Sequence, residues 1–323
     1  MTIEEIKWKD GSASYRCSGC GERFDTKPFL YGGPKTEGKR GLDLSGKMTR
    51  SAVFAAGDMA NIQKPGMHQT YVASTKTIPV LIHLDKDHTT LRGNFYKANK
   101  LSRTGKTVLL LSGSGDTLAN YLGSVVDLYL SLIKVNVLAV DYRGFGDNQG
   151  TPGSRGTYTD AAAMLSYLTS SKNTGGRGAA ISTVFVHGYS LGSGPATELA
   201  LRNGGIAGLI LHCPFTSAGD MAQEGIGLGP LGWVAKKITA CGHAYDNYKK
   251  IVNVTCPIMI ITGNSDGMQP HGKRLANRVK QRCLEDTYNG GHTDVSRIFS
   301  SQNLKSFINQ QGNSRWVNSP LAV

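Results

Sequence analysis

The chain has 323 residues, 39% of them hydrophobic, and a net charge of +13 at pH 7. This length and apolar content suit one large packed domain, with or without an appendage. The longest apolar runs, such as Val108–Leu111, fall far short of the roughly 18–20 residues of a membrane span. The first residues mix charges with isolated apolar side chains, unlike a secretory signal, and the six cysteines are too thinly spread to suggest a disulfide framework. We therefore expect a cytoplasmic protein, the alternatives being peripheral membrane association and export without a cleavable signal.

Positive charge is concentrated late in the chain, where residues 235–282 carry nine Lys or Arg against two acidic residues, Asp246 and Asp266. A solvated basic face is the simplest interpretation. The alternatives are an anionic membrane surface or an acidic protein partner that this face would contact. Nucleic acid is disfavoured, because aromatic residues are not interleaved with the basic ones as they are in base-stacking surfaces.

Residues 1–70 lack steady periodicity and are predicted to form a loosely structured extension for targeting or partner binding. Residues 71–311 form the predicted domain, and residues 312–323 form a C-terminal tail. In the domain, short apolar strands alternate with amphipathic helices, which predicts a mostly parallel, doubly wound α/β sheet with helices on both faces. The first two strands are expected to form its antiparallel edge. The predicted strands lie within residues 77–84, 89–98, 107–111, 134–146, 181–188, 206–215, 256–263 and 283–288, and the predicted helices end near residues 132, 170, 204, 282 and 309.

A glycine-rich loop, Ser112 to Asp116, follows the strand at residues 107–111. Such loops cradle phosphates in nucleotide-binding proteins, or they place backbone N–H groups around the oxyanion of an acyl-transfer enzyme. The loop lacks the third glycine of a dinucleotide-binding fingerprint and is not followed by Gly-Lys-Ser/Thr. An oxyanion loop is therefore the better interpretation, provided that a nucleophile ends another strand of the same sheet.

The sharpest motif is Gly188-Tyr189-Ser190-Leu191-Gly192, which follows a predicted strand and opens a predicted helix. A tight strand-to-helix turn holds a nucleophilic serine in strained backbone geometry, and glycines two residues before and after it avoid a clash. The helix N-terminus behind the serine stabilises developing negative charge. Ser190 is therefore the predicted nucleophile.

A serine nucleophile needs a base and an acid that orients the base. Asp266 follows the strand at residues 256–263, and His292 lies in a glycine-rich loop after the strand at residues 283–288. Both are therefore predicted to lie at the same sheet edge as Ser190. Asp294 is the rival acid. Structural roles are predicted for three other histidines and for an acid that heads a turn: His187, His212, His271 and Asp141.

Four stretches of the chain resemble the α/β-hydrolase superfamily: DYRGFGDNQGTPGSRGTYTDAAAMLSYL, GYSLGSGPA, CPFTS and GGH. Within the superfamily they look most like the α/β-hydrolase-domain proteins that include acyl-protein thioesterases. The likeness covers about residues 77–309. It implies the α/β-hydrolase fold, with Ser190 as nucleophile, Asp266 as acid and His292 as base.

The resemblance also indicates where an oxyanion hole would lie. Those relatives usually have His-Gly where this chain has Ser112-Gly113, and the donor is a backbone N–H further along. The hole is therefore assigned to the amides of Ser114 and Leu191. We expect hydrolysis of an acyl ester or thioester through an acyl-enzyme, with no metal or organic cofactor. Two other functions stay open: a serine peptidase of the same fold, and a membrane- or partner-binding effector module on a hydrolase scaffold.

Cys17 and Cys20 stand in the sequence YRCSGCGERF, which has the spacing of one zinc knuckle. A structural zinc ion needs four ligands. No second pair follows nearby, so His68 or cysteines of another chain would have to complete the site. The alternatives are a reversible thiol pair, lipid attachment or no special role.

Residues 215–250 are the candidate cap, because they fall where this fold commonly carries an inserted lid. They mix apolar residues such as Ile226 and Trp233 with glycines and then turn basic. A mobile apolar lid over an acyl-chain pocket is one interpretation. A helix packed on the core is the other.

Overall fold

The structure of the protein is a computed structural model that describes residues 3–7, 13–17, 23–24, 76–84, 89–98, 105–114, 116–118, 121–224, 245–279 and 283–310. The chain divides into two compact units, one of Met1–Phe54 with Ser217–Ala244 and the other of Ala55–Thr216 with Tyr245–Val323. Among the described residues, no helix combines the length and apolar character needed to cross a bilayer. The predicted boundaries at residues 70 and 311, and most of the predicted cap, lie outside the described residues and stay predictions.

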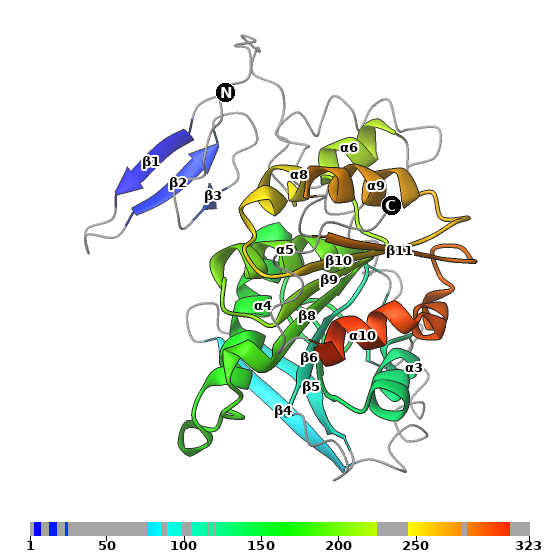
Figure 1. Ribbon diagram of the computed structural model, residues 1–323. Coiled ribbons are helices and arrows are strands. Elements are labelled where there is room, and N and C mark those ends of the chain that lie inside the picture. Colours follow the sequence, from blue (N-terminus) through cyan, green and yellow to red (C-terminus); the bar gives the residue numbers. More distant parts are fainter. Residues whose placement is uncertain are drawn as a thin grey trace. The chain divides into compact units, whose positions relative to one another are not determined.

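The smaller unit contains a three-stranded sheet in the order β1-β2-β3 (Figure 1). Its strands are antiparallel and comprise Ile3–Lys7, Ala13–Cys17 and Arg23–Phe24. The expectation of a loosely structured extension is wrong for these residues. Strands of two to five residues place at most three side chains on one face, too few for an alternation to be recognised in the sequence. Helix α6, Ala218–Gln223, also belongs to this unit.

The larger unit is built on an eight-stranded sheet in the order β11-β10-β9-β8-β6-β7-β5-β4 (Figure 1). The strands from β6 to β11 run parallel, whereas β4 and β5 are antiparallel and form one edge. The predicted doubly wound sheet and its antiparallel edge are therefore confirmed. The strands are β4 (Lys76–Leu84), β5 (Thr89–Lys97), β6 (Thr107–Leu111), β7 (Asn136–Val140), β8 (Val184–Tyr189), β9 (Gly208–His212), β10 (Ile258–Gly263) and β11 (Cys283–Tyr288).

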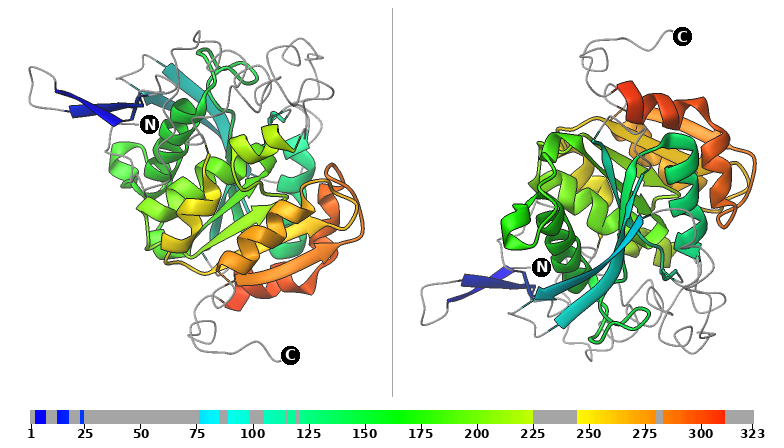
Figure 2. Two further views of the ribbon diagram at one scale, coloured as in Figure 1. Left: turned by 90° about the horizontal axis from the view of Figure 1, so that it is seen from above. Right: turned by 90° about the horizontal axis from the view of Figure 1, so that it is seen from below.

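Helices cover both faces of this sheet (Figure 2). One face carries α4, α5, α8 and α9, and the other carries α3, its π-helical continuation and α10. Each predicted helix of the domain has a counterpart among them. The helices are α3 (Tyr121–Leu128, continued by the π-helix Tyr129–Ile133), α4 (Ser154–Thr169), α5 (Ser193–Arg202), α8 (Asn247–Lys250), α9 (Gln269–Arg278) and α10 (Gln302–Gln310). Short 3-10 turns lie at Lys172–Thr174, Ile181–Thr183, Ser190–Gly192, Ile251–Asn253 and Val295–Ser300.

The core lies on both sides of the central strands. Every residue of β6, β8 and β9 is buried, as expected for parallel strands covered on two faces. On the α3 and α10 side, aromatic rings meet edge to face: Phe185 of β8 with Phe307 of α10 at 6.0 Å between centroids, and Tyr129 with Phe299 at 4.8 Å. This packing fixes the helices on the sheet and holds the carboxyl ends of the parallel strands at one edge.

Polar contacts secure the turn that follows β7. Asp141 is buried, and its Oδ1 accepts the Leu118 N–H at 2.9 Å, which links the turn to the loop after β6. Asn148 donates to the Asp141 carbonyl oxygen at 2.6 Å and accepts the Arg92 N–H at 2.9 Å. These contacts agree with the structural role predicted for Asp141. Burial raises the pKa of its carboxyl to about 7, against the weaker opposing effect of the Leu118 N–H.

We predict that Asp141→Asn removes a pH-dependent part of the stability. The pKa of Asp141 is about 7 in the folded chain and 3.8 in the unfolded one, so its stabilising contribution is complete below about pH 4 and is lost as the pH rises through about 7. The asparagine keeps the acceptor for Leu118 but does not ionise. Urea unfolding at pH 4 to 8 should show the wild type losing up to about 4 kcal/mol relative to the variant over this range. Parallel pH dependences of the two proteins would contradict the prediction.

Candidate active site

Ser190 lies on a sharp turn between β8 and α5 and has a φ of 50°, in the left-handed region. The two flanking glycines are needed there. A Cβ on Gly188 would lie 2.3 Å from the Gly192 carbonyl oxygen, and one on Gly192 would lie 2.2 Å from the Leu111 carbonyl oxygen. Any side chain at either position would collide with backbone, which is the physical reason for the predicted glycine spacing.

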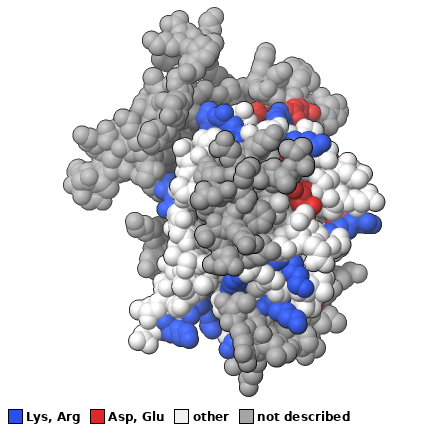
Figure 3. Space-filling view, in the orientation of Figure 1, with Lys and Arg blue, Asp and Glu red and all other residues white. Residues whose placement is uncertain are grey.

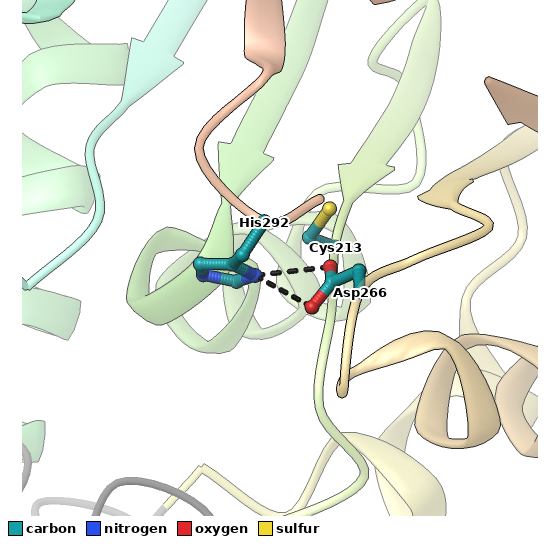
Figure 4. A group of neighbouring side chains, drawn as sticks. All are labelled: Cys213, Asp266 and His292. Atoms are coloured by element: carbon teal, nitrogen blue, oxygen red, sulfur yellow. Dashed lines mark hydrogen bonds and ion pairs between the residues drawn. The ribbon is translucent and has the colours of Figure 1, made fainter. Parts of the chain in front are cut away.

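The structure brings Asp266, His292 and Ser190 into one hydrogen-bonded series. His292 Nε2 lies 3.0 Å from Ser190 Oγ, and His292 Nδ1 lies 3.1 and 3.0 Å from the two Asp266 oxygens. Asp266 follows β10, and His292 follows β11, so loops after neighbouring strands supply the acid and the imidazole (Figure 4). With Asp266 ionised, Nδ1–H donates to the carboxylate, and Nε2 is left to accept the Ser190 hydroxyl proton.

Asp266 is buried yet remains suited to carry charge. Burial by itself raises the pKa of this carboxyl, but hydrogen bonds from the His292 imidazole and from neighbouring donors outweigh burial and hold the pKa below its ordinary value. One of those donors is the Met268 N–H, 2.9 Å from Oδ1. The carboxylate is therefore ionised at neutral pH and fixed in position before any substrate arrives.

The rival acid has a different role. The Asp294 carboxylate accepts the Gly291 N–H at 2.8 Å and closes the turn that carries His292. His187 of β8 and His212 of β9 are buried, and burial lowers the pKa of both, to about 3 for His187. His271 is buried in α9 and contacts the Thr216 hydroxyl at 2.9 Å. These positions agree with the structural roles predicted for the three histidines.

The segments that carry the two predicted oxyanion donors are neighbours. Leu191 directly follows Ser190 and is buried. Ser114 lies in the loop after β6, and the close approach of Gly192 to the Leu111 carbonyl oxygen brings the start of that loop against the elbow. Ser112, which stands in place of a histidine, is 1% exposed, and its Oγ has no hydrogen-bond partner within the described part of the chain.

Asp116 is a residue at the site whose importance the sequence reasoning missed. Its carboxylate accepts the Gly113 N–H at 3.2 Å and so closes the loop that carries Ser114. Burial raises the pKa of Asp116 to about 6, although the Gly113 N–H and the charge of His292 act in the opposite direction. The position of Asp116 at the end of the glycine-rich loop that starts at Ser112 is the sequence feature that could have indicated this role. Asp116 thus adds a second carboxyl near His292, and it titrates in a different range from Asp266.

Cys213 is a second missed residue. It follows β9 directly, has a φ of 48° and is buried. Its Sγ lies 3.3 Å from the Tyr288 hydroxyl and within 4.8 Å of ligand atoms of Asp266 and His292 (Figure 4). Among the described residues, these three form the one group that could hold a metal ion. Burial raises the pKa of the Cys213 thiol, however, which disfavours the thiolate that metal binding requires.

Two other predicted features fall largely outside the described residues. Cys17 ends β2, but Cys20 and His68 are not described, so a zinc site stays a prediction. The apolar part of the cap, residues 225–244, is not described either.

Basic residues are prominent on the described surface. Helix α9 exposes Lys273, Arg274 and Arg278 and contains no acidic residue, and the Arg278 guanidinium lies 4.5 Å from the centre of the Tyr248 ring. Figure 3 shows Lys and Arg side chains spread over several places on the viewed face, with fewer Asp and Glu. Residues 235–244 and 280–282 of the predicted basic stretch are not described. The partner of this surface therefore stays a prediction.

We predict that Gly188→Ala destabilises the elbow. The added Cβ would lie 2.3 Å from the Gly192 carbonyl oxygen and 2.6 Å from the Ala196 Cβ, so the turn must shift at a cost of about 1–3 kcal/mol in the free energy of unfolding. Gly153→Ala is the matched control, because a Cβ there meets nothing within 4 Å. Chemical denaturation measures both variants. Equal stabilities would show that the close approach at Gly188 is not a constraint.

The chain is similar to several known proteins. A family model described as "Serine aminopeptidase, S33" matches residues 102–250. Human alpha/beta hydrolase domain-containing protein 17B is 32% identical over 199 residues, which cover 59% of this chain and 63% of that protein. A multifunctional-autoprocessing repeats-in-toxin of Vibrio vulnificus is 32% identical over 186 residues, 54% of this chain and 3% of the toxin. The chain thus spans less than two thirds of the length of these relatives.

Solved structures show the same architecture. An alpha-beta hydrolase from Vibrio vulnificus matches with a TM-score of 0.66 and 24% identity, over 84% of this chain and 95% of that one. An esterase of Pyrococcus furiosus matches with a TM-score of 0.57 and 19% identity, over 76% of this chain and 93% of that one. The sheet order and these matches identify the α/β-hydrolase fold. The matches to the family model and to the human relative show, beside the fold, that this chain is similar in sequence to proteins of the α/β-hydrolase superfamily.

Proposed function

We propose that the protein is a serine hydrolase that cleaves an acyl ester or thioester. The observation that carries the proposal is the series of hydrogen bonds from Asp266 through His292 to a serine at φ 50° on a strand-to-helix turn. A buried carboxylate, an imidazole and a hydroxyl in this order are what activation of a serine requires. The match to the family model and the fold shared with an esterase support a hydrolase.

The proposed mechanism uses these side chains in turn. His292 Nε2 takes the Ser190 hydroxyl proton as Oγ attacks the carbonyl carbon, and Asp266 stabilises the imidazolium that forms. The amides of Leu191 and Ser114 donate to the oxyanion of the tetrahedral intermediate. The imidazolium then protonates the leaving alkoxide or thiolate. Water, deprotonated by the same imidazole, hydrolyses the acyl-enzyme and regenerates Ser190.

A serine peptidase is the second candidate, because the matching family model is described as a serine aminopeptidase. The same side chains would act on an amide, and the imidazolium would protonate a leaving amine. An effector or binding module on an inactive scaffold is less well supported, since the geometry retains strained backbone at Ser190 that a binding module does not need.

Ser190→Ala, His292→Ala and Asp266→Asn should each abolish most of the activity. We expect losses of roughly 10⁴- to 10⁶-fold in kcat, because the three groups act as one unit. Reaction with a fluorophosphonate probe, followed by gel fluorescence and mass spectrometry, should modify Ser190 in the wild type and nothing in Ser190→Ala.

Ser265→Ala is the matched control for these variants. This exposed serine neighbours Asp266, and within the described part of the chain its hydroxyl donates to the Asn264 side-chain oxygen at 3.2 Å. Its activity should equal that of the wild type. If Ser190→Ala still reacted with the probe and retained esterase activity, the assignment of the nucleophile would be wrong.

Substrate class should be decided by direct competition. We expect hydrolysis of p-nitrophenyl esters of graded chain length and of an acyl-thioester peptide, with little cleavage of aminoacyl p-nitroanilides. Preferential cleavage of the anilides, dependent on Ser190, would instead establish the peptidase.

We propose separately that the basic surface contacts an anionic membrane or an acidic protein. Support comes from the net charge of +13 and from the exposed basic side chains of α9. Flotation of the full chain with vesicles containing an anionic lipid should exceed that with neutral vesicles and fall as salt rises, since surface charges are screened. Equal flotation on both vesicle types would exclude an electrostatic membrane contact.

A further inference from the structure

Tyr189, the residue before the serine, makes a direct contact with the histidine loop. Its hydroxyl donates to the His292 carbonyl oxygen at 2.8 Å, across 103 positions of sequence. Its ring also lies against the imidazole, with centroids 5.3 Å apart and planes inclined by 32°. One side chain therefore restrains both the backbone and the ring of His292.

The same ring contacts two further segments. A Cβ on Gly113 would lie 3.1 Å from two Tyr189 ring carbons, so the loop after β6 rests against this ring, and only glycine leaves ordinary space there. On β9, the His212 ring lies 4.9 Å from the Tyr189 centroid. Tyr189 thus lies among the oxyanion loop, the end of β9 and the histidine loop, and is bonded covalently to Ser190.

The chemistry of this side chain suits a fixed contact. Tyr189 is 5% exposed, and burial raises the pKa of its phenol well above the ordinary value. The hydroxyl therefore remains a donor throughout the pH range in which a histidine base would work. Two other side chains hold the rest of the histidine turn: the Tyr288 hydroxyl donates to the Gly291 carbonyl oxygen at 3.0 Å, and the Asp294 carboxylate accepts the Gly291 N–H at 2.8 Å.

We propose that Tyr189 is a positioning residue that sets the distance and angle between His292 and Ser190 and seats the oxyanion loop against the elbow. This inference rests on the proposed function, since positioning matters only if His292 acts as a base for Ser190. Tyr189 would not touch the reacting atoms. It would act through His292 and through the loop that carries Ser114.

Two substitutions separate the contacts of the hydroxyl from those of the ring. Tyr189→Phe removes the bond to the His292 carbonyl oxygen and keeps the ring, and kcat should fall roughly two- to tenfold with little change in KM, as expected for loss of a hydrogen bond. Tyr189→Leu also removes the ring, and kcat should fall on the order of 10²-fold, since displacements near 1 Å at a reacting centre have effects of this size. The rate constant of fluorophosphonate labelling should fall in parallel.

Tyr96→Phe is the matched control. Tyr96 is also a buried tyrosine, 9% exposed, and its hydroxyl accepts a hydrogen bond from Asn94 at 3.2 Å on β5, a strand of the antiparallel edge. Tyr96→Phe loses this hydrogen bond, which should lower Tm slightly and leave kcat unchanged. A second readout, independent of turnover, is the low-field proton resonance of the His292 Nδ1–H, identified by its absence in His292→Ala. Faster exchange of this proton is expected in both Tyr189 variants and not in Tyr96→Phe.

The outcomes separate the two proposals. In one outcome the wild type reacts with the probe, and both Tyr189 variants match its kcat and labelling rate. Tyr189 then has no positioning role, and the proposed function stands. If the Tyr189 variants lose only Tm, as Tyr96→Phe does, the role is merely structural and the inference is likewise overturned. If the wild type neither reacts with the probe nor cleaves any of the substrates, the proposed function fails and the inference fails with it.

Discussion

The left-handed backbone at Ser190 is the constraint on which the rest of the site depends. A non-glycine residue in this conformation costs on the order of 1–3 kcal/mol and persists only where its surroundings enforce it. Here β8 is hydrogen-bonded to β6 on one side and to β9 on the other, which fixes the strand up to Tyr189. Gly188 and Gly192 then allow backbone segments to approach to distances that no side chain would permit. The turn is strained because the sheet and the first turn of α5 leave it no other path.

Burial raises the pKa of Asp266, Asp116 and Asp141 alike, and the hydrogen bonds that each carboxyl accepts decide whether its pKa ends above or below the ordinary value. Asp266 is surrounded by donors that hold its pKa below the ordinary value, so it stays charged beside His292. Asp116 and Asp141 accept fewer hydrogen bonds, and burial raises their pKa to about 6 and about 7. A buried carboxyl remains ionised only where donors converge on it. The donors around Asp266, which keep its carboxyl ionised, are therefore the reason to choose it as the acid of the proposed mechanism.

A series of ring contacts connects His292 with the buried core of the larger unit. From the His292 imidazole, contacts between rings run through Tyr189 to His212, then to His187, and on to Tyr129 at the side of the sheet covered by α3. The Tyr129 hydroxyl lies 2.8 Å from His187 Nδ1, and burial keeps that histidine neutral at ordinary pH. These histidines therefore serve as aromatic packing groups. Because they are close-packed, changes in the core beneath His292 are transmitted to its position.

The sequence predicts the alternation of strands and helices, the turn that carries Ser190 and three polar residues that follow strands at one edge. Those features depend on local periodicity and on glycine spacing, which can be read along the chain. It did not reveal the strands within residues 3–24, which are too short to show a period. The folded chain shows that Asp266 reaches His292 while Asp294 closes the neighbouring turn, and that Tyr189 reaches a carbonyl oxygen 103 positions away. Such choices depend on sheet twist and loop conformation, which bring distant residues to within hydrogen-bonding distance and leave no local pattern in the sequence.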